Sequence, residues 1–210
     1  MDSFFFSAMT SKTLNLDASN ATNQLYQSYS NQGLIFRHVD LDILFKDTPL
    51  IKLHENNQFM PMEYQIQSDQ TNKEIVKSVH LSDAIRIILI FKYGGWYSDL
   101  DMVIIKPLTE LKNVLSCDEF PDIENHLLSQ DFLGKKVSNA IFHFEKEHSF
   151  LKKCIENFAS LFDGTWGSGG PNLFQVVLNN LCQIDEMPTY LSNQNYTPES
   201  CDGVTVLKYR

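Results

Sequence analysis

The chain has 210 residues, of which 43% are hydrophobic, and it carries a formal net charge of −9. This length is enough for one α/β domain with a sizeable core. The negative charge argues against nucleic acid as a partner, because nucleic acid phosphates favour basic surfaces. No stretch approaches the ~18 to 20 apolar residues of a membrane span, and no cleavable signal is evident.

The N-terminal part begins with an apolar run, Phe4 to Phe6, followed by small hydroxyl residues. The run predicts a first buried strand that ends in a ligand-facing loop at Ser7, since ligands lie beyond the carboxyl ends of strands in open α/β sheets. A frayed hydrophobic start is the alternative. Further on, the pattern predicts a strand at 33–39, a short helix at 41–46 and a long polar surface loop at 54–78.

The centre of the sequence is the stretch 80–108. Residues 81–92 are apolar on nearly every side, which predicts a helix surrounded by protein. Ser82 is expected to cap its start, and Gly94 to take the left-handed conformation that ends it. The apolar run at 102–105 predicts a short buried strand.

Four charges interrupt this apolar background. Asp83 and Arg86 share a helix face, and Asp99 and Asp101 share one face of an extended segment. Two adjacent carboxylates at a strand end offer hard oxygen ligands to Mn²⁺ or Mg²⁺, and leave the rest of the shell for water and a diphosphate. The alternative is a pair of solvated aspartates, because the D-x-D pattern often arises by chance.

After the central stretch, the sequence predicts a strand at 140–144 and a helix that runs to Leu161 with an apolar stripe. The acidic run 118–124 is expected to be a solvated face, and Glu145 and Glu147 to be surface charges. The glycine-rich segment 163–171 precedes a predicted helix at 172–181. Such a loop can offer free N–H groups to an anion or a sugar oxygen, although a plain loop-to-helix turn is the alternative.

The stretch LSDAIRIILIFKYGGWYSDLDMVIIKPL resembles the signature of glycosyltransferases with the DXD sugar-binding motif. Within them, the chain is most similar to the α-1,4-galactosyltransferases and α-1,4-N-acetylglucosaminyltransferases of glycosyltransferase family 32. FRHVDLDILFKDTPL before the signature, and SNAIFHFEKEHSFLKKCIENF, DGTWGSGGPNLFQVVL and CDGVTVL after it, resemble the family in the same order. The resemblance covers most of residues 34–207.

This resemblance implies a single GT-A-like nucleotide-sugar-binding domain of the α/β class over residues 1–210, with a mixed central sheet and helices on both faces. The DXD sugar-binding region is expected at 34–115 and the α-1,4-glycosyltransferase C-terminal region at 132–210, with the domain incomplete at both ends. The resemblance implies the Golgi lumen as the location, and membrane association is expected only through an anchor absent from this chain.

The implied activity is transfer of galactose from UDP-galactose to a lactosylceramide-type glycolipid, in α-1,4 linkage and with retention of configuration. Transfer of N-acetylglucosamine or mannose, and an inactive nucleotide-sugar-binding remnant, are the alternatives. A glycosidase is disfavoured, because its carboxylates flank the scissile bond from opposite sides, whereas Asp99 and Asp101 point the same way.

The resemblance also implies roles for individual residues. Binding of the Mn²⁺ or Mg²⁺ ion is assigned to Asp99 and Asp101, and catalysis to the same pair with Asn139. Donor binding is assigned to Asp83, Arg86, Gly94, Gly95, Tyr97 and Ser7. Acceptor or sugar binding is assigned to Trp166, Gly167, Gly170 and Pro171.

The cysteines lack C-x-x-C spacing, which argues against a zinc site. Cys182 and Cys201 bracket a loop rich in Pro, Asn and Ser, and a bridge between them would restrict about 20 residues, worth roughly 3 kcal/mol in the chain-entropy model. Asn20 and Asn195 begin N-glycosylation sequons. These features together indicate the secretory pathway.

Overall fold

The computed structural model describes residues 5–6, 39–56, 58–59, 70–118, 136–182 and 201–207. The helices are α2 (Leu41–Phe45), α3 (Ile51–Glu55), α5 (Gln70–Tyr93), α6 (Ser149–Leu161) and α7 (Pro171–Cys182). The strands are β1 (Phe5–Phe6), β2 (Gly95–Ser98), β3 (Val114–Asp118), β4 (Lys136–Phe144) and β5 (Thr205–Val206). Ser7, Asn20, His38 and Asn195 lie outside the described residues.

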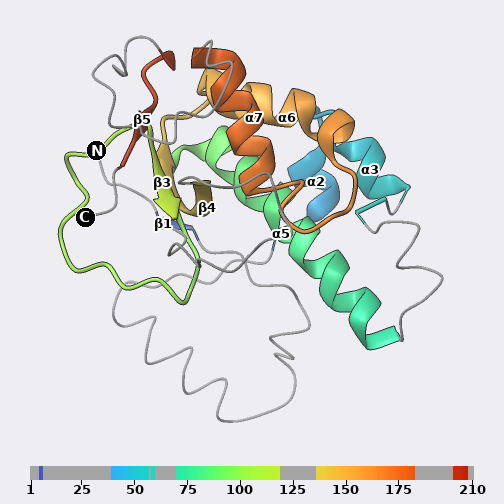
Figure 1. The fold of residues 1–210 in the computed structure, drawn as a ribbon. Helices are drawn as coiled ribbons and strands as arrows, with labels where there is room; N and C mark the ends of the chain where they lie inside the picture. Colours follow the sequence, from blue (N-terminus) through green and yellow to red (C-terminus); the bar gives the residue numbers. More distant parts are fainter. Residues whose placement is uncertain are drawn as a thin grey trace, which may run out of the picture.

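The strands form one sheet in the order β1-β2-β4-β3-β5. β1 pairs with β2 and β3 pairs with β5 in parallel, whereas β4 is antiparallel to both β2 and β3. Figure 1 shows this sheet beside a layer of helices. The predicted α/β class with a mixed central sheet is therefore confirmed.

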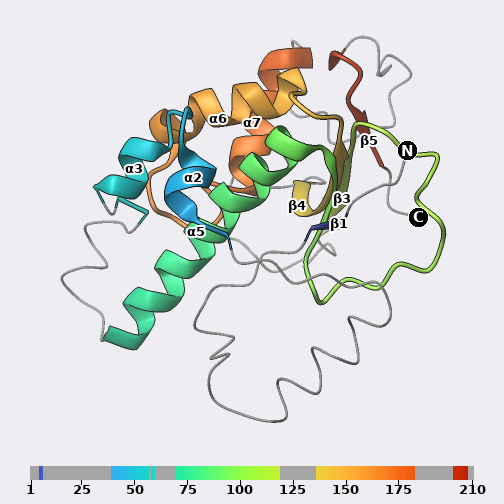
Figure 2. The ribbon, with the colours of Figure 1, turned by 180° about the vertical axis from the view of Figure 1, so that it is seen from behind.

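The helices gather on one side of the sheet in both ribbon views (Figures 1 and 2). α5 lies over Tyr97 of β2, and Phe174 of α7 meets Phe142 of β4 edge to face at 5.2 Å between ring centroids. Tyr97 and Phe142 stack as neighbours on this same face. Within the described part of the chain the helices occupy this face only, so the expected second helical layer is not seen there.

Helix α5 is longer than predicted, since it begins at Gln70 and occupies part of the segment expected to be a loop. Figure 1 shows its first turns projecting beyond the other helices, where a helix needs no continuous apolar stripe. Ser82 therefore lies inside the helix and does not cap it. The end of α5 is as predicted, because Gly94 has φ +70° and its N–H donates to the Ile90 carbonyl at 2.8 Å.

The apolar run 102–105 is not a strand, and that prediction is wrong. Strand β2 ends at Ser98, and the following segment leaves the sheet on the side away from the helices (Figures 1 and 2). Val103 and Ile105 are 83% and 85% exposed. Residue types that favour strands form one only beside a partner strand, and no described strand pairs with this segment.

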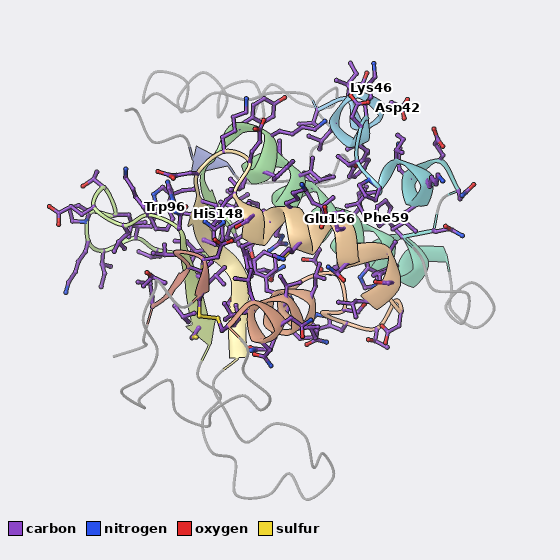
Figure 3. The ribbon with its side chains drawn as sticks, turned by 90° about the horizontal axis from the view of Figure 1, so that it is seen from above. Asp42, Lys46, Phe59, Trp96, His148 and Glu156 are labelled. Carbon is purple, nitrogen blue, oxygen red and sulfur yellow. A yellow bond between two sulfur atoms is a disulfide. The ribbon has the colours of Figure 1, made fainter. Side chains whose placement is uncertain are left out.

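Helix α6 follows the prediction, with its apolar stripe buried from Phe150 to Phe158 and only Leu161 partly exposed. Phe59 packs edge to face on Phe158 at 6.1 Å. Figure 3 labels Phe59 beside α6, the helix that also carries the exposed Glu156. The helical layer thus closes over its own aromatic core.

A disulfide joins Cys182, at the end of α7, to Cys201, which precedes β5 (Figure 3). It ties the last helix to the edge of the sheet. Cys117 and Cys154 are both buried, and burial raises the pKa of the Cys154 thiol. Among the helices of the described residues, none is both long and apolar enough to span a bilayer.

Candidate functional site

The site is built at the carboxyl end of β2, where Asp99 follows the strand. The Asp99 N–H donates to the Ala140 carbonyl at 2.7 Å, which fixes the backbone against β4. The Tyr97 hydroxyl donates to Asp99 Oδ1 at 2.7 Å. Tyr97 itself is fully buried, so it orients the Asp99 carboxylate from the protein core and is not open to a ligand from solvent.

Arg86 of α5 is the only described cation at this position, and it is 7% exposed. Its Nη1 donates to the Asn139 carbonyl at 2.9 Å and lies 3.3 Å from Asp99 Oδ1. Its Nε lies 3.5 Å from Asp83 Oδ1, so one guanidinium stands between two carboxylates. The guanidinium carbon is 4.6 Å from the Tyr97 ring centroid, a cation–π contact.

The Ser82 side chain completes the arginine's shell, since Arg86 Nη2 donates to Ser82 Oγ at 3.2 Å. One turn of helix separates the two residues. This is the role the sequence did not predict for Ser82. A polar residue four positions before a buried arginine is the pattern that could have signalled it.

Asp83 is 4% exposed and accepts a hydrogen bond from Asn139 Nδ2 at 2.8 Å. Burial raises the pKa of Asp83 to about 6, against the opposing effects of Arg86 and of the Asn139 amide. The backbone of Gly170 also packs against the Asp83 carboxylate. A Cβ at Gly170 would lie 2.5 Å from Asn139 Nδ2 and 2.9 Å from both Asp83 oxygens. Only glycine fits this approach.

Asn139 shares the core face with Phe142 and Phe144 because β4 is irregular. Alternation from Val137 places Asn139 on the core face, whereas alternation back from Phe144 and Phe142 places it on the opposite face. The register shifts between Leu115 and Ser116 of β3, opposite residues 139–141 of β4. Such bulges re-aim side chains beside functional sites.

The proposed metal ligands differ in their surroundings. Asp101 is exposed, and the Asp99 side chain is 32% exposed despite its contacts with Arg86 and Tyr97. Both carboxylates can thus reach an ion from solvent, and hard oxygen donors suit Mn²⁺ or Mg²⁺. In the described part of the chain no three acidic, histidine or cysteine groups cluster, so a metal here would need the ligand's own oxygens and water.

Other predicted site residues lie apart from this cluster. Gly94 and Gly95 stand at the opposite end of β2 from Asp99, and a Cβ at Gly94 would lie 2.8 Å from the Lys146 N. Gly94 ends α5 and Gly95 begins β2, so the structure gives both a backbone role and brings neither beside Asp99. The Gly167 carbonyl accepts hydrogen bonds from the N–H groups of Gly170 and Asn172, at 3.0 Å each. Pro171 is the first residue of α7.

The loop before α7 was expected to offer free N–H groups. The amides of Thr165, Ser168, Gly170 and Asn172 all donate within the loop instead. Trp166 in this loop is 74% exposed. These four amides are therefore already bound within the loop and are not free for a ligand.

The titration of Asp83 gives a testable pH dependence. Asp83 is faced by Arg86 from α5, Asn139 from β4, Asp99 after β2 and the Gly170 backbone. A carboxyl whose folded pKa is raised from 3.8 to about 6 contributes stability that is present below pH 4 and lost as pH rises through 6.

Urea unfolding of the wild type and of Asp83→Asn measures this contribution. Relative to the variant, the wild type should lose about 2 kcal/mol between pH 4 and pH 7. A difference that stays constant over this range would contradict the buried, proton-binding carboxyl.

A mixed sheet with buried charges beyond a strand's carboxyl end is the arrangement of an α/β ligand-binding domain. Comparison with known proteins narrows this class. The family described as glycosyltransferase sugar-binding region containing DXD motif matches residues 7–127, and the alpha 1,4-glycosyltransferase conserved region matches residues 143–210. The chain belongs to this family of DXD-motif glycosyltransferases.

Two relatives illustrate the match. The lactosylceramide 4-alpha-galactosyltransferase of Mus musculus is 31% identical over 172 residues, which are 81% of this chain and 38% of the relative. The alpha-1,4-N-acetylglucosaminyltransferase of Homo sapiens is 30% identical over 187 residues, 87% of this chain and 46% of the relative. The chain thus spans less than half the length of either relative.

Proposed function

We propose that the chain is the catalytic core of a retaining hexosyltransferase that moves galactose from UDP-galactose to a terminal sugar of a lactosylceramide-type glycolipid in α-1,4 linkage. The bond from C1 of galactose to the diphosphate oxygen breaks, and its electron pair leaves with UDP. The acceptor hydroxyl oxygen bonds to C1 with the same anomeric configuration, and the hydroxyl proton passes to the departing UDP. The domain would comprise residues 1–210 and act in the Golgi lumen.

The observation that carries this proposal is the convergence of Asp83, Arg86, Asp99 and Asn139 at the end of β2. A hydroxyl-rich donor needs fixed acceptors, and Asp83 and Asn139 would bind donor hydroxyls there. Arg86 fixes Asp99 and offsets part of the negative charge of the two carboxylates. A preorganised array of this kind needs no rearrangement when charge develops in the transition state.

Asp99 and Asp101 would hold a Mn²⁺ or Mg²⁺ ion, which when bound neutralises negative charge on the diphosphate. This assignment rests on the donor chemistry of the two carboxylates and on their access to solvent. Asp99 is held by Tyr97, whereas Asp101 is exposed. A bound ion would order Asp101 against the fixed Asp99.

The donor sugar has a second candidate. The name of the Homo sapiens relative indicates N-acetylglucosamine in α-1,4 transfer, and the cluster's hydroxyl-binding groups suit either sugar. A mannose donor has the same hydroxyl chemistry. A screen of UDP-galactose, UDP-N-acetylglucosamine and GDP-mannose for hydrolysis or transfer separates the three.

Calorimetric titration of UDP with and without Mn²⁺ tests the proposal. Asp101→Asn should weaken metal-dependent UDP binding at least tenfold, about 1.4 kcal/mol, while the thermal midpoint stays unchanged because Asp101 is exposed. Glu110→Gln is the matched control, since Glu110 is an exposed carboxylate of the same segment and should bind UDP as the wild type does.

Two outcomes would overturn parts of the proposal. Undiminished metal-dependent binding in Asp101→Asn would remove the metal assignment. A folded wild-type chain that binds no UDP would favour the inactive remnant over the transferase.

A further inference from the structure

A pocket of about 150 Å³ lies between the end of α6, the loop 163–170 and the first turns of α7. Its polar lining comes from Asp163, Thr165, Ser168 and Asn172. Leu161 and Val176 line it with partly exposed apolar side chains. Pockets that enclose drug-sized ligands measure roughly 300 to 1,000 Å³, so this one suits a much smaller group.

The polar groups offer both kinds of hydrogen bond. Asp163 Oδ1 accepts from the Thr165 N–H at 2.8 Å and from Thr165 Oγ1 at 2.7 Å, which fixes the exposed carboxylate in place. These bonds from Thr165 also lower the pKa of Asp163, so it is an ionised acceptor. The half-buried Asn172 side chain makes no hydrogen bond within the described structure, and its amide can both donate and accept.

This chemistry selects among ligand classes. The Asp163 carboxylate repels an anion such as phosphate. No cluster of three metal-ligating groups exists among the described residues, which removes the usual basis for a cation site. A group with several hydroxyls remains, because each hydroxyl can donate to Asp163 and accept from Asn172 while its C–H face contacts Leu161 and Val176.

The pocket shares its loop with the site at β2. At one end of the loop, the Gly164 carbonyl lies 3.1 Å from His80 Nε2 of α5. At the other end, Gly170 contacts Asp83 and Asn139. His80 and Asp83 lie one turn apart on the same helix, so both ends of the loop are held by α5 beside the proposed donor site.

We propose that this pocket, lined by Asp163, Ser168 and Asn172, is a subsite for one pyranose residue of the acceptor glycan. The inference rests on the proposed transferase function for its role, but not for sugar binding itself. Asp163 accepts hydroxyl protons of the sugar and Asn172 bonds a neighbouring hydroxyl. The loop then lies between the acceptor sugar and the cluster of Asp83 and Asn139.

Methyl β-D-galactoside and lactose, titrated into the isotope-labelled chain at millimolar concentrations, test the subsite by NMR. The amide resonances of Thr165, Ser168 and Asn172 should shift saturably. Asn172→Leu, which keeps the shape and removes the amide, should weaken the interaction at least tenfold. Asn180→Leu is the matched control, because it makes the same change at an exposed position further along α7 and should leave the titration unchanged.

Val176→Phe fills the pocket from an exposed position and should also abolish the shifts. Shifts confined to other regions, or an equal affinity in Asn172→Leu and the wild type, would overturn the subsite. UDP titration of Asn172→Leu keeps the two proposals apart. Sugar binding without UDP binding in the wild type would overturn the transferase proposal alone, and UDP binding without sugar binding would overturn the subsite alone.

Discussion

Replacing Arg86 with methionine is expected to lower the free energy of unfolding by about 3 to 5 kcal/mol and to abolish UDP binding. The guanidinium stands between Asp83 and Asp99, at 3.5 Å and 3.3 Å from the nearest oxygens. Without it, the buried Asp83 carboxylate loses its cationic partner, and the partly exposed Asp99 carboxylate loses the same contact. The Asn139 carbonyl also loses the hydrogen bond it accepts at 2.9 Å.

Two further variants make this prediction specific. Arg86→Lys keeps the charge, but one ammonium cannot replace the planar fork that contacts Ser82, Asn139 and both carboxylates, so an intermediate loss is expected. Adding Asp83→Asn to Arg86→Met removes one of the unpaired charges and should recover part of the stability, which a double-mutant cycle measures. A loss below ~1 kcal/mol in Arg86→Met would contradict a buried, interdependent cluster.

The sequence predicted contacts between residues that are close together along the chain. Asp83 and Arg86 were expected to share a helix face, and the structure brings them to 3.5 Å. The end of α5 at Gly94 and the buried stripe of α6 followed equally from local residue types. Propensity and periodicity carry this information because the interacting residues are only one or two turns apart.

What the sequence could not predict depends on tertiary pairing. The run 102–105 has strand-forming residues, but no described strand pairs with it, so it lies exposed. Asn139 shares the core face with Phe142 because the β3–β4 register shifts between them. Alternation along β4 carries no sign of this shift, and the resemblance to the family, not the pattern, pointed to Asn139.

The role of Gly170 also could not be predicted from the residues around it. Its glycine was expected to serve backbone freedom or anion binding, whereas the structure shows that it leaves room for two polar side chains. Nothing local to 163–171 reveals that Asp83 and Asn139, distant in sequence, pack against it. The requirement becomes visible only when helix α7, β4 and α5 are assembled.

Gly170→Ala is therefore expected to weaken UDP binding at least tenfold and to lower the free energy of unfolding by about 1 to 3 kcal/mol. The added methyl would lie 2.5 Å from Asn139 Nδ2 and 2.9 Å from each Asp83 oxygen. This clash can be relieved only if the Asn139–Asp83 hydrogen bond breaks or α7 moves outward. Calorimetric UDP titration and urea unfolding measure the two effects.

Gly169→Ala is the matched control, because it makes the same change one residue earlier. There the methyl would meet Phe158 Cζ at 2.7 Å, in the aromatic core and away from the carboxylates. Both variants should lose stability, but only Gly170→Ala should lose binding beyond what its unfolded fraction explains. Equal binding losses at equal stability would show that Gly170 acts through the packing of α7, and not through the acidic cluster that it contacts.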